Sequence, residues 1–149
     1  MTLSLTWSPE FETGIDIIDS QHKQLFDYLQ DVEEAIHVAN GSRVEEIVRG
    51  LAHYAISHNT FEESLMRQAD YPMLDAHAQL HQTFKARAEG YLEQLDNGQD
   101  PMRVARDIRN FIGLWLINHI KREDKHYVPY VKKKLDRSFA KRMISKIFG

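Results

Sequence analysis

The chain has 149 residues, enough for one domain with a single core, and its net charge of -3 is too small to indicate a nucleic-acid partner. The absence of cysteine excludes disulfides, thiolate metal sites, iron–sulfur clusters and haem attached through cysteine. Hydrophobic residues make up 42% of the chain beside only 7 glycines and 4 prolines, a balance typical of a mostly helical soluble protein.

The sequence indicates neither a targeting segment nor a membrane span. Its first residues, MTLSLTWSPEF, lack the basic region followed by an apolar region that marks a secretory signal. The longest apolar run, residues 111–117, is far too short to cross a bilayer. We therefore expect a cytoplasmic protein with one domain over residues 1–149.

The chain is expected to begin with an irregular arm, residues 1–14, which carries Trp7 and Phe11. Apolar residues then recur every three or four positions over residues 18–36, as they do on one face of an α-helix. Asn40-Gly41 follows this pattern and is expected to end the first helix.

A second helical pattern covers residues 44–65, with a capping box of Ser42 and Glu45 expected at its start. Tyr71-Pro72 ends it, because proline disfavours helix in the residue before it. The third pattern follows at once and covers residues 74–95.

The fourth helix is expected to start at Asp100-Pro101, as an N-cap and a first helical residue, after the turn at Asn97-Gly98. Its apolar face covers residues 105–119. Four helices of about twenty residues joined by short loops predict an all-α fold, an antiparallel up-down-up-down bundle over about residues 15–128.

Residues 130–149 form a basic, amphipathic tail after Pro129. Its basic residues are Lys132, Lys133, Lys134, Arg137, Lys141, Arg142 and Lys146, against one acid, Asp136. Its apolar stripe is Leu135, Phe139, Met143, Ile144 and Ile147. Such helices bind membrane surfaces or protein partners in some proteins, but we expect this one to be short and docked on the bundle.

Histidine is the enriched residue, and five of its eight copies fall on the inward faces of the predicted helices. Up-down folding brings all five to the same end of the bundle, within a slab of about 10–15 Å. Glu62 follows one of them by four residues, and so lies on the same face. The five are His22, His58, His77, His81 and His119.

Five imidazoles at one level indicate a metal site rather than separately hydrogen-bonded core histidines, because each would otherwise need its own buried partner. Neutral imidazole suits iron, zinc, copper and nickel. The donors outnumber the needs of one ion with an open position, which indicates a dinuclear site bridged by carboxylates. Glu62 supplies one bridge, and Glu123 or Asp124 could supply the second; helical spacing from His119 favours Glu123 but leaves both open.

The order and spacing of these residues resemble the hemerythrin family, through the segments DSQHKQL, HNTFE, HAQLH and HIKRED. Trp7, GIDIIDSQH and the YP pair are similar to its bacterial single-domain branch, and the resemblance covers about residues 7–130. It implies Asp124 rather than Glu123 as a ligand, and therefore an overwound or bulged turn after His119. The implied ligands are His77, His81 and His119 for one iron, His22 and His58 for the other, and Glu62 and Asp124 as bridges.

The resemblance further implies two non-haem iron ions with an oxo or hydroxo bridge, and reversible O2 binding for storage, delivery or sensing rather than enzyme activity. The iron with two histidines would keep the open position. Trp115, Leu116 and Ile120 would then lie near the O2 pocket, although helical spacing equally fits ordinary core packing. Asn59 stands where relatives usually carry phenylalanine, and is expected to admit water to that pocket or to turn outward.

The main alternative is a ferritin-like diiron oxidase or ferroxidase, which uses two Glu-x-x-His motifs. The chain contains Glu34-x-x-His37 and Glu123-x-x-His126, but the bundle places them at opposite ends. We therefore expect His37, His126 and also His53 at the surface. Peroxide or nitric oxide handling are further alternatives.

Overall fold

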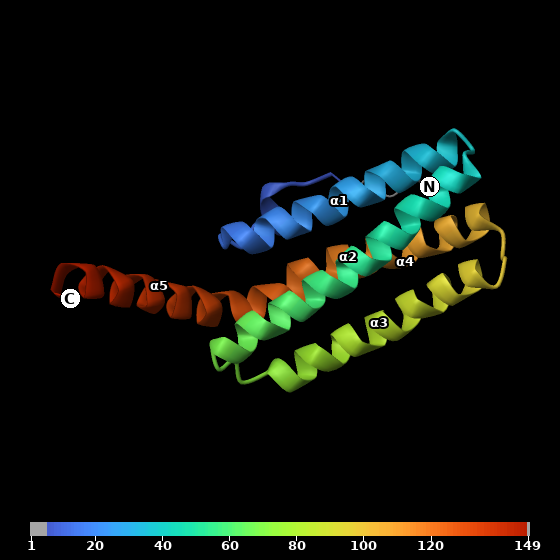
Figure 1. Cartoon of the computed structure of the whole chain (residues 1–149). Helices are drawn as coiled ribbons and strands as arrows, with labels where there is room; N and C mark the ends of the chain where they lie inside the picture. The colour runs from blue at the N-terminus through green and yellow to red at the C-terminus, as the bar shows by residue number, and fades with distance from the viewer. Residues whose placement is uncertain (1–5, 149) are drawn as a thin grey trace.

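The computed structural model describes residues 6–148, and of residues 137–148 only the helical backbone. The helices are η1 (Pro9–Phe11), α1 (Asp16–His37), α2 (Gly41–Gln68), α3 (Leu74–Asp96), α4 (Pro101–His119), η2 (Ile120–Asp124) and α5 (Lys125–Phe148). No strand occurs among the described residues. Helices α1 to α4 run alternately up and down along one another, so the predicted all-α, four-helix bundle is confirmed (Figure 1).

Side-chain caps mark the starts of α2 and α4. Asp100 caps α4, accepting a hydrogen bond from the Met102 amide at 3.2 Å, and Pro101 is the first helical residue, as predicted. Helix α2 differs from its prediction. Its N-cap is Asn40, whose side chain accepts from the Arg43 amide at 3.1 Å, and Ser42 already lies inside the helix.

The interior consists of two apolar clusters with a polar layer between them. The larger cluster fills the bundle around Leu29, Leu51 and Ile108. The smaller one contains Ile18 and Tyr127 and lies at the end from which α5 leaves. Along each helix, the buried histidines and acids stand between residues of the two clusters.

The N-terminal arm packs against the side of the bundle. Phe11 and Phe26 have ring centroids 5.0 Å apart, and Trp7 meets Phe26 edge-on at 5.6 Å. Lys125 Nζ donates to the carbonyl oxygen of Glu12 at 3.1 Å, so the arm is also tied to the start of α5.

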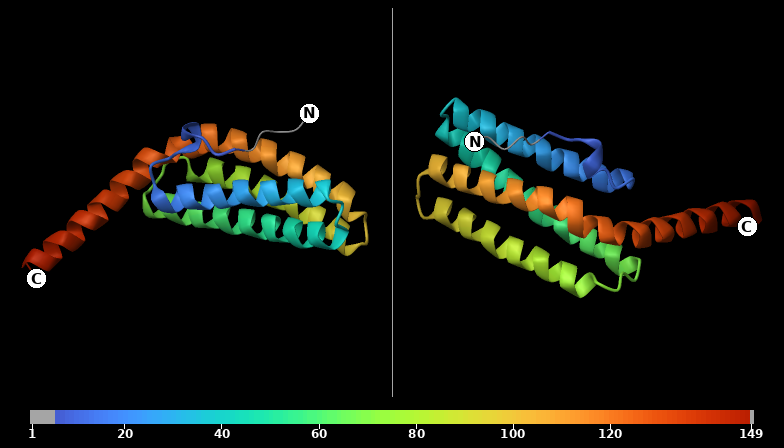
Figure 2. Two further views of the ribbon diagram at one scale, coloured as in Figure 1. Left: turned by 90° about the horizontal axis from the view of Figure 1, so that it is seen from above. Right: turned by 180° about the vertical axis from the view of Figure 1, so that it is seen from behind.

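The tail differs from its prediction. Helix α5 runs without interruption through Pro129 and extends past the end of the bundle instead of forming a short helix folded back on it (Figures 1 and 2). Tyr127 and Val131 on either side of the proline are both buried. Burying two such side chains contributes about 1.5–3 kcal/mol each, enough to offset the cost of about 3 kcal/mol for an interior proline.

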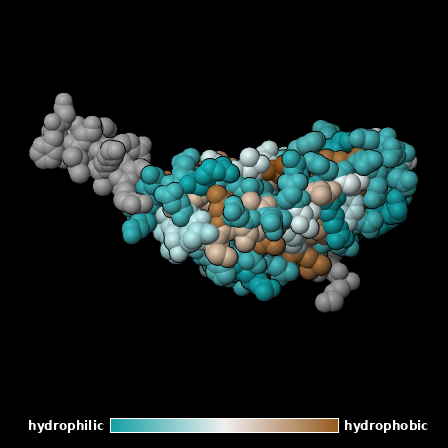
Figure 3. Space-filling model, turned by 90° about the horizontal axis from the view of Figure 1, so that it is seen from below, coloured by the Kyte–Doolittle hydropathy of each residue, from teal (hydrophilic) through white to brown (hydrophobic). Residues whose placement is uncertain are grey.

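The apolar stripe of the tail can be followed only at its first residue, Leu135, which is exposed; its other members lie outside the described side chains. The face of the molecule in Figure 3 is mostly hydrophilic, with separate hydrophobic areas. Within the described residues, no helix combines the length and the hydropathy that crossing a membrane requires.

Candidate metal centre

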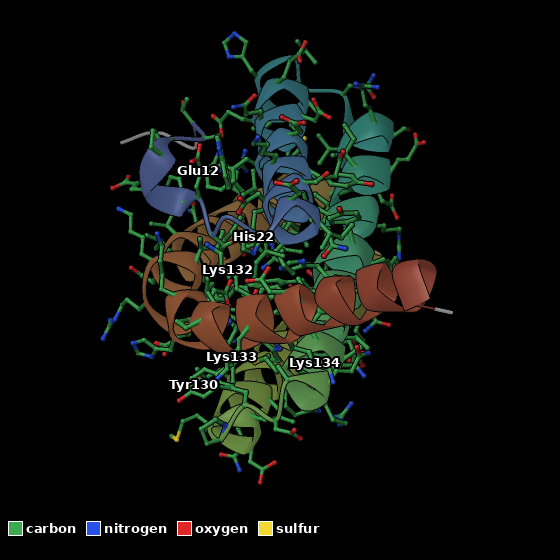
Figure 4. All side chains as sticks on the ribbon, turned by 90° about the vertical axis from the view of Figure 1, so that its left-hand side faces the viewer. Glu12, His22, Tyr130, Lys132, Lys133 and Lys134 are labelled. Carbon is green, nitrogen blue, oxygen red and sulfur yellow. The ribbon has the colours of Figure 1, made fainter. Side chains whose placement is uncertain are left out.

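The seven residues expected to bind metal come together in the polar layer. All are buried, with at most 5% of any of them exposed. Viewed from the α5 end, His22 lies within the ring of helices (Figure 4). The contributions are His22 from α1, His58 and Glu62 from α2, His77 and His81 from α3, His119 from α4 and Asp124 from η2.

One group of donors is centred on three imidazoles. His119 Nε2 lies 3.0 Å from the Nε2 atoms of both His77 and His81. Asp124 Oδ1 lies 3.1 Å from His119 Nε2, and Glu62 Oε2 lies 3.6 Å from His81 Nε2. These five donor atoms lie within 4.8 Å of one another.

This spacing fits a shared metal ion better than hydrogen bonding. A ring nitrogen carries either one hydrogen or one lone pair, so His119 Nε2 cannot form good hydrogen bonds to two other imidazole nitrogens. Two nitrogens bound at about 2.0–2.1 Å and at a right angle to one ion lie about 3.0 Å apart. The three imidazoles therefore stand where ligands of one ion would stand.

A second group of donors shares both carboxylates with the first. His58 Nε2 lies 2.8 Å from Glu62 Oε1, and His22 Nε2 lies 3.1 Å from the same oxygen. Asp124 Oδ2 lies 3.3 Å from His22 Nε2. Glu62 and Asp124 thus each direct one oxygen to each group, which is the arrangement of a bridging carboxylate.

The carboxylates carry further evidence for a cation. Among the described residues, Glu62 Oε2 and both Asp124 oxygens are buried and have no hydrogen-bond partner. Burial raises the pKa of both acids, but the surrounding imidazoles outweigh this, lowering the pKa of Glu62 to about 2 and that of Asp124 well below its usual value. Two ionised, incompletely paired carboxylates inside a core are costly unless a cation compensates them.

The histidines differ in how they hold protons. Burial lowers the pKa of His81 to about 3, so this imidazole is neutral and suited to bind metal. Burial also lowers the pKa of His22, but the carboxylates of Asp124 and Glu62, at 3.3 and 3.1 Å from its Nε2, outweigh it and raise that pKa to about 9. A metal ion would have to displace the proton that the carboxylates hold on His22.

Three outer residues fix the orientation of the ligands, and the sequence analysis missed all of them. With Nε2 turned toward the donors, His58 Nδ1 donates to Gln21 Oε1 at 2.6 Å, and His81 Nδ1 donates to Glu63 Oε2 at 3.0 Å. The Tyr127 hydroxyl donates to Glu62 Oε1 at 3.1 Å.

The choice between the two acids after His119 is decided by the backbone. Asp124 is buried among the donors, whereas Glu123 is partly exposed. Residues Ile120–Asp124 form a π-helix, in which a turn takes about one residue more than in an α-helix. The spacing argument for Glu123 assumed a regular α-helix and was wrong for that reason.

The residues expected near the O2 pocket differ from one another in their surroundings. The Trp115 ring stacks on His119, with centroids 4.2 Å apart and planes inclined by 15°. Leu116 and Ile120 are buried in the larger apolar cluster. Asn59 is also buried, and its Nδ2 has no hydrogen-bond partner, so the outward orientation is not the one observed.

The Glu-x-x-His motifs of the ferritin-like alternative take no part in the donor groups. Glu34 and His37 lie exposed near the end of α1, away from the polar layer. His126 is exposed, as is His53, in agreement with their predicted surface positions.

Comparison with known proteins gives a consistent result. Residues 13–131 match the hemerythrin HHE cation-binding domain. Bacteriohemerythrin of Pseudomonas aeruginosa is 30% identical over 97% of this chain and 98% of its own length, and that of Stenotrophomonas maltophilia is 33% identical over 89% and 84%. The crystal structure of a hemerythrin mutant superposes with a TM-score of 0.74 at 25% identity, covering 87% of this chain and 98% of that one.

Proposed function

This chain belongs to the hemerythrin family, and we propose on that basis that it binds O2 reversibly at two non-haem iron ions. The observation that carries the proposal is the pair of donor groups that share Glu62 and Asp124. The proposed ligands are His77, His81 and His119 for one iron and His22 and His58 for the other, with both carboxylates and an oxo or hydroxo group as bridges.

Two irons would supply the electrons that bound O2 takes up and returns on release. The protein's part is to hold the ions with mostly neutral donors. Gln21 and Glu63 keep the Nδ1 hydrogens of His58 and His81 on the outer side of the rings, so that both Nε2 atoms are free to bind metal.

The two donor groups are unequal, and this inequality provides room for a ligand. One group offers three imidazoles and the other offers His22 and His58 alone. An ion held by the second group would therefore have one protein donor fewer, which would leave a position for O2. We place the O2 pocket beside it, with Leu116 and Ile120 excluding water and Asn59 as its polar wall.

The proposed role is that of a carrier, in storage, delivery or sensing, rather than an enzyme. The test is anaerobic reconstitution with Fe(II), iron analysis, and visible spectra through repeated addition and removal of O2. We expect two irons per chain and an absorption band that appears and disappears with O2. One iron per chain, or retention of zinc alone, would contradict the metal assignment.

The same experiment separates the carrier from an oxidase. An oxidase would consume O2 continuously in the presence of a reductant, and its band would not return when O2 is removed and restored. Continuous consumption with irreversible bleaching would therefore replace the proposal with the oxidase alternative.

A further inference from the structure

A cleft between α2 and α3 runs from the surface to one of the proposed metal ligands, His81. Its volume is about 220 Å³. Its mouth is formed by exposed residues, and its inner part includes the buried Asn59 and His81, so the cleft extends inward as far as the His81 side chain. The mouth is formed by Thr60, Gln82 and Lys85, and the inner part by Asn59, Glu63 and His81.

Asn59 lines the inner end of the cleft, and its amide nitrogen is a buried hydrogen-bond donor without a partner among the described residues. Asn59 is 5% exposed, and its Nδ2 has no acceptor. A buried amide hydrogen without a partner costs about 1–3 kcal/mol, so a water or an anion that accepts from it is stabilised there. Asn59 directly follows the proposed ligand His58 on α2, and it lines the same cleft as the proposed ligand His81.

The charges around the cleft also favour acceptors of hydrogen bonds. The side chain of Lys85 lies at the mouth, and within the described residues its ammonium group pairs only loosely with Glu89, at 3.9 Å. The opposing carboxylate of Glu63 is engaged by His81 Nδ1. The cleft volume of about 220 Å³ is several times the roughly 30 Å³ that one water occupies, so the cleft has room for water beside these polar groups.

We propose that this cleft is a polar access port, through which water and small anions reach the metal centre and in which Asn59 is the innermost donor. The proposal rests on the proposed function, because it assigns a route to that same centre. In this proposal the polar route through the cleft is distinct from the apolar wall of the O2 pocket, which Leu116 and Ile120 form.

The first test is thiol labelling, which the absence of cysteine makes specific. In the iron-loaded protein, Asn59→Cys should react with 2-sulfonatoethyl methanethiosulfonate at least about tenfold faster than Ala55→Cys. Ala55 is the matched control, one turn earlier on α2, 4% exposed and outside the cleft lining. Equal rates for the two thiols would overturn the port.

The second test leaves the interior unchanged and blocks the mouth. Azide binding to the diferric protein is followed by stopped-flow absorbance in Gln82→Trp and in the control Gln79→Trp, which is exposed on α3 outside the cleft. We expect the association and dissociation rate constants of Gln82→Trp to fall together, by about fivefold, with an unchanged Kd. Unchanged rates, or a change in Kd alone, would overturn the port.

The two proposals fail in different ways. A protein that labels rapidly at Asn59→Cys but binds no O2 keeps the port and loses the carrier function. A protein that cycles O2 reversibly, while Gln82→Trp and Gln79→Trp behave alike, keeps the carrier function and loses the port.

Discussion

Tyr127 shows how a single hydroxyl can govern the shared carboxylate. It donates to Glu62 Oε1 from a fully buried position. Burial, and next the charges of Glu62 and Asp124, raise its pKa well above the usual value, so the hydroxyl stays protonated. A permanent donor of this kind holds one oxygen of Glu62 in place and limits the charge that this oxygen gives to a metal.

Replacing this tyrosine tests the effect directly. Tyr127→Phe keeps the ring and removes the hydrogen bond, so iron release to a chelator should become about tenfold faster. The rate is followed by absorbance of the chelate. Tyr130→Phe serves as control, because Tyr130 is exposed on the same helix. Equal release rates in both variants would show that the hydroxyl does not hold Glu62.

We expect Asn59 to weaken the protection of the centre, because its buried, unpartnered amide nitrogen can hold a water there. Asn59→Phe replaces the amide with a larger apolar ring. The lifetime of the O2-loaded protein should then lengthen by about threefold or more, because less water reaches the bound ligand. The lifetime is the decay time of the visible band in air. An unchanged lifetime at full iron content would show that Asn59 does not control access.

The sequence predicts the residues that lie on the inner helix faces, but not the partners that orient them. His22, His58 and His81 stand at helical spacing from apolar core residues, so their shared layer follows from the pattern. Gln21 and Glu63 stand next to inward residues in the sequence, but no spacing pattern marks them as partners of the imidazoles. Their bonds depend on how each imidazole is rotated, which no spacing rule determines.

At the scale of elements, the π-helix η2 is the feature that regular periodicity misses. It brings Asp124 into the layer five residues after His119, and the turn after it starts the helix that carries Tyr127. Only the resemblance to hemerythrins indicated such a turn. The prediction of a boundary at Pro129 failed for a similar reason. Buried residues on both sides of this proline keep α5 helical.

The register argument can be tested by deletion. Removing exposed Arg122 leaves Asp124 four residues after His119 in what would become a regular α-helix, so two irons per chain should be retained. Removing His126 instead keeps the π-turn but rotates Tyr127 by about 100° out of the core. We expect this second deletion to lower the thermal midpoint by more than about 5 °C. Loss of iron on deletion of Arg122 would contradict the register argument.

For the whole molecule, the buried histidines make the stability of the iron-free chain depend on pH. Above pH 6.5 the folded chain keeps a proton on His22 that the unfolded chain has lost, so stability falls as pH rises toward about 9. Below pH 6.5 His81 takes up a proton in the unfolded chain, whereas in the folded chain it stays neutral down to about pH 3. Stability therefore falls in that direction as well.

The iron-free protein should accordingly be most stable near pH 6.5, and Glu62, with its pKa lowered to about 2, adds to the loss below pH 4.5. Thermal midpoints measured from pH 4 to 9.5 test this. With iron bound, ions replace the proton on His22, and the decline between pH 6.5 and 9 should disappear. A midpoint that rises steadily with pH in the iron-free chain would contradict the assignment.

The polar layer between two apolar clusters also affects how the bundle opens. Its donors come from α1, α2, α3, α4 and η2, so with iron bound as proposed, none of these elements could move away from the others without losing a bond to metal. In a chain without cysteine, iron would then act as the cross-link that disulfides provide in other small proteins. Partial opening near the layer would be suppressed, and the lifetime of the fold would be set by the rate at which iron departs.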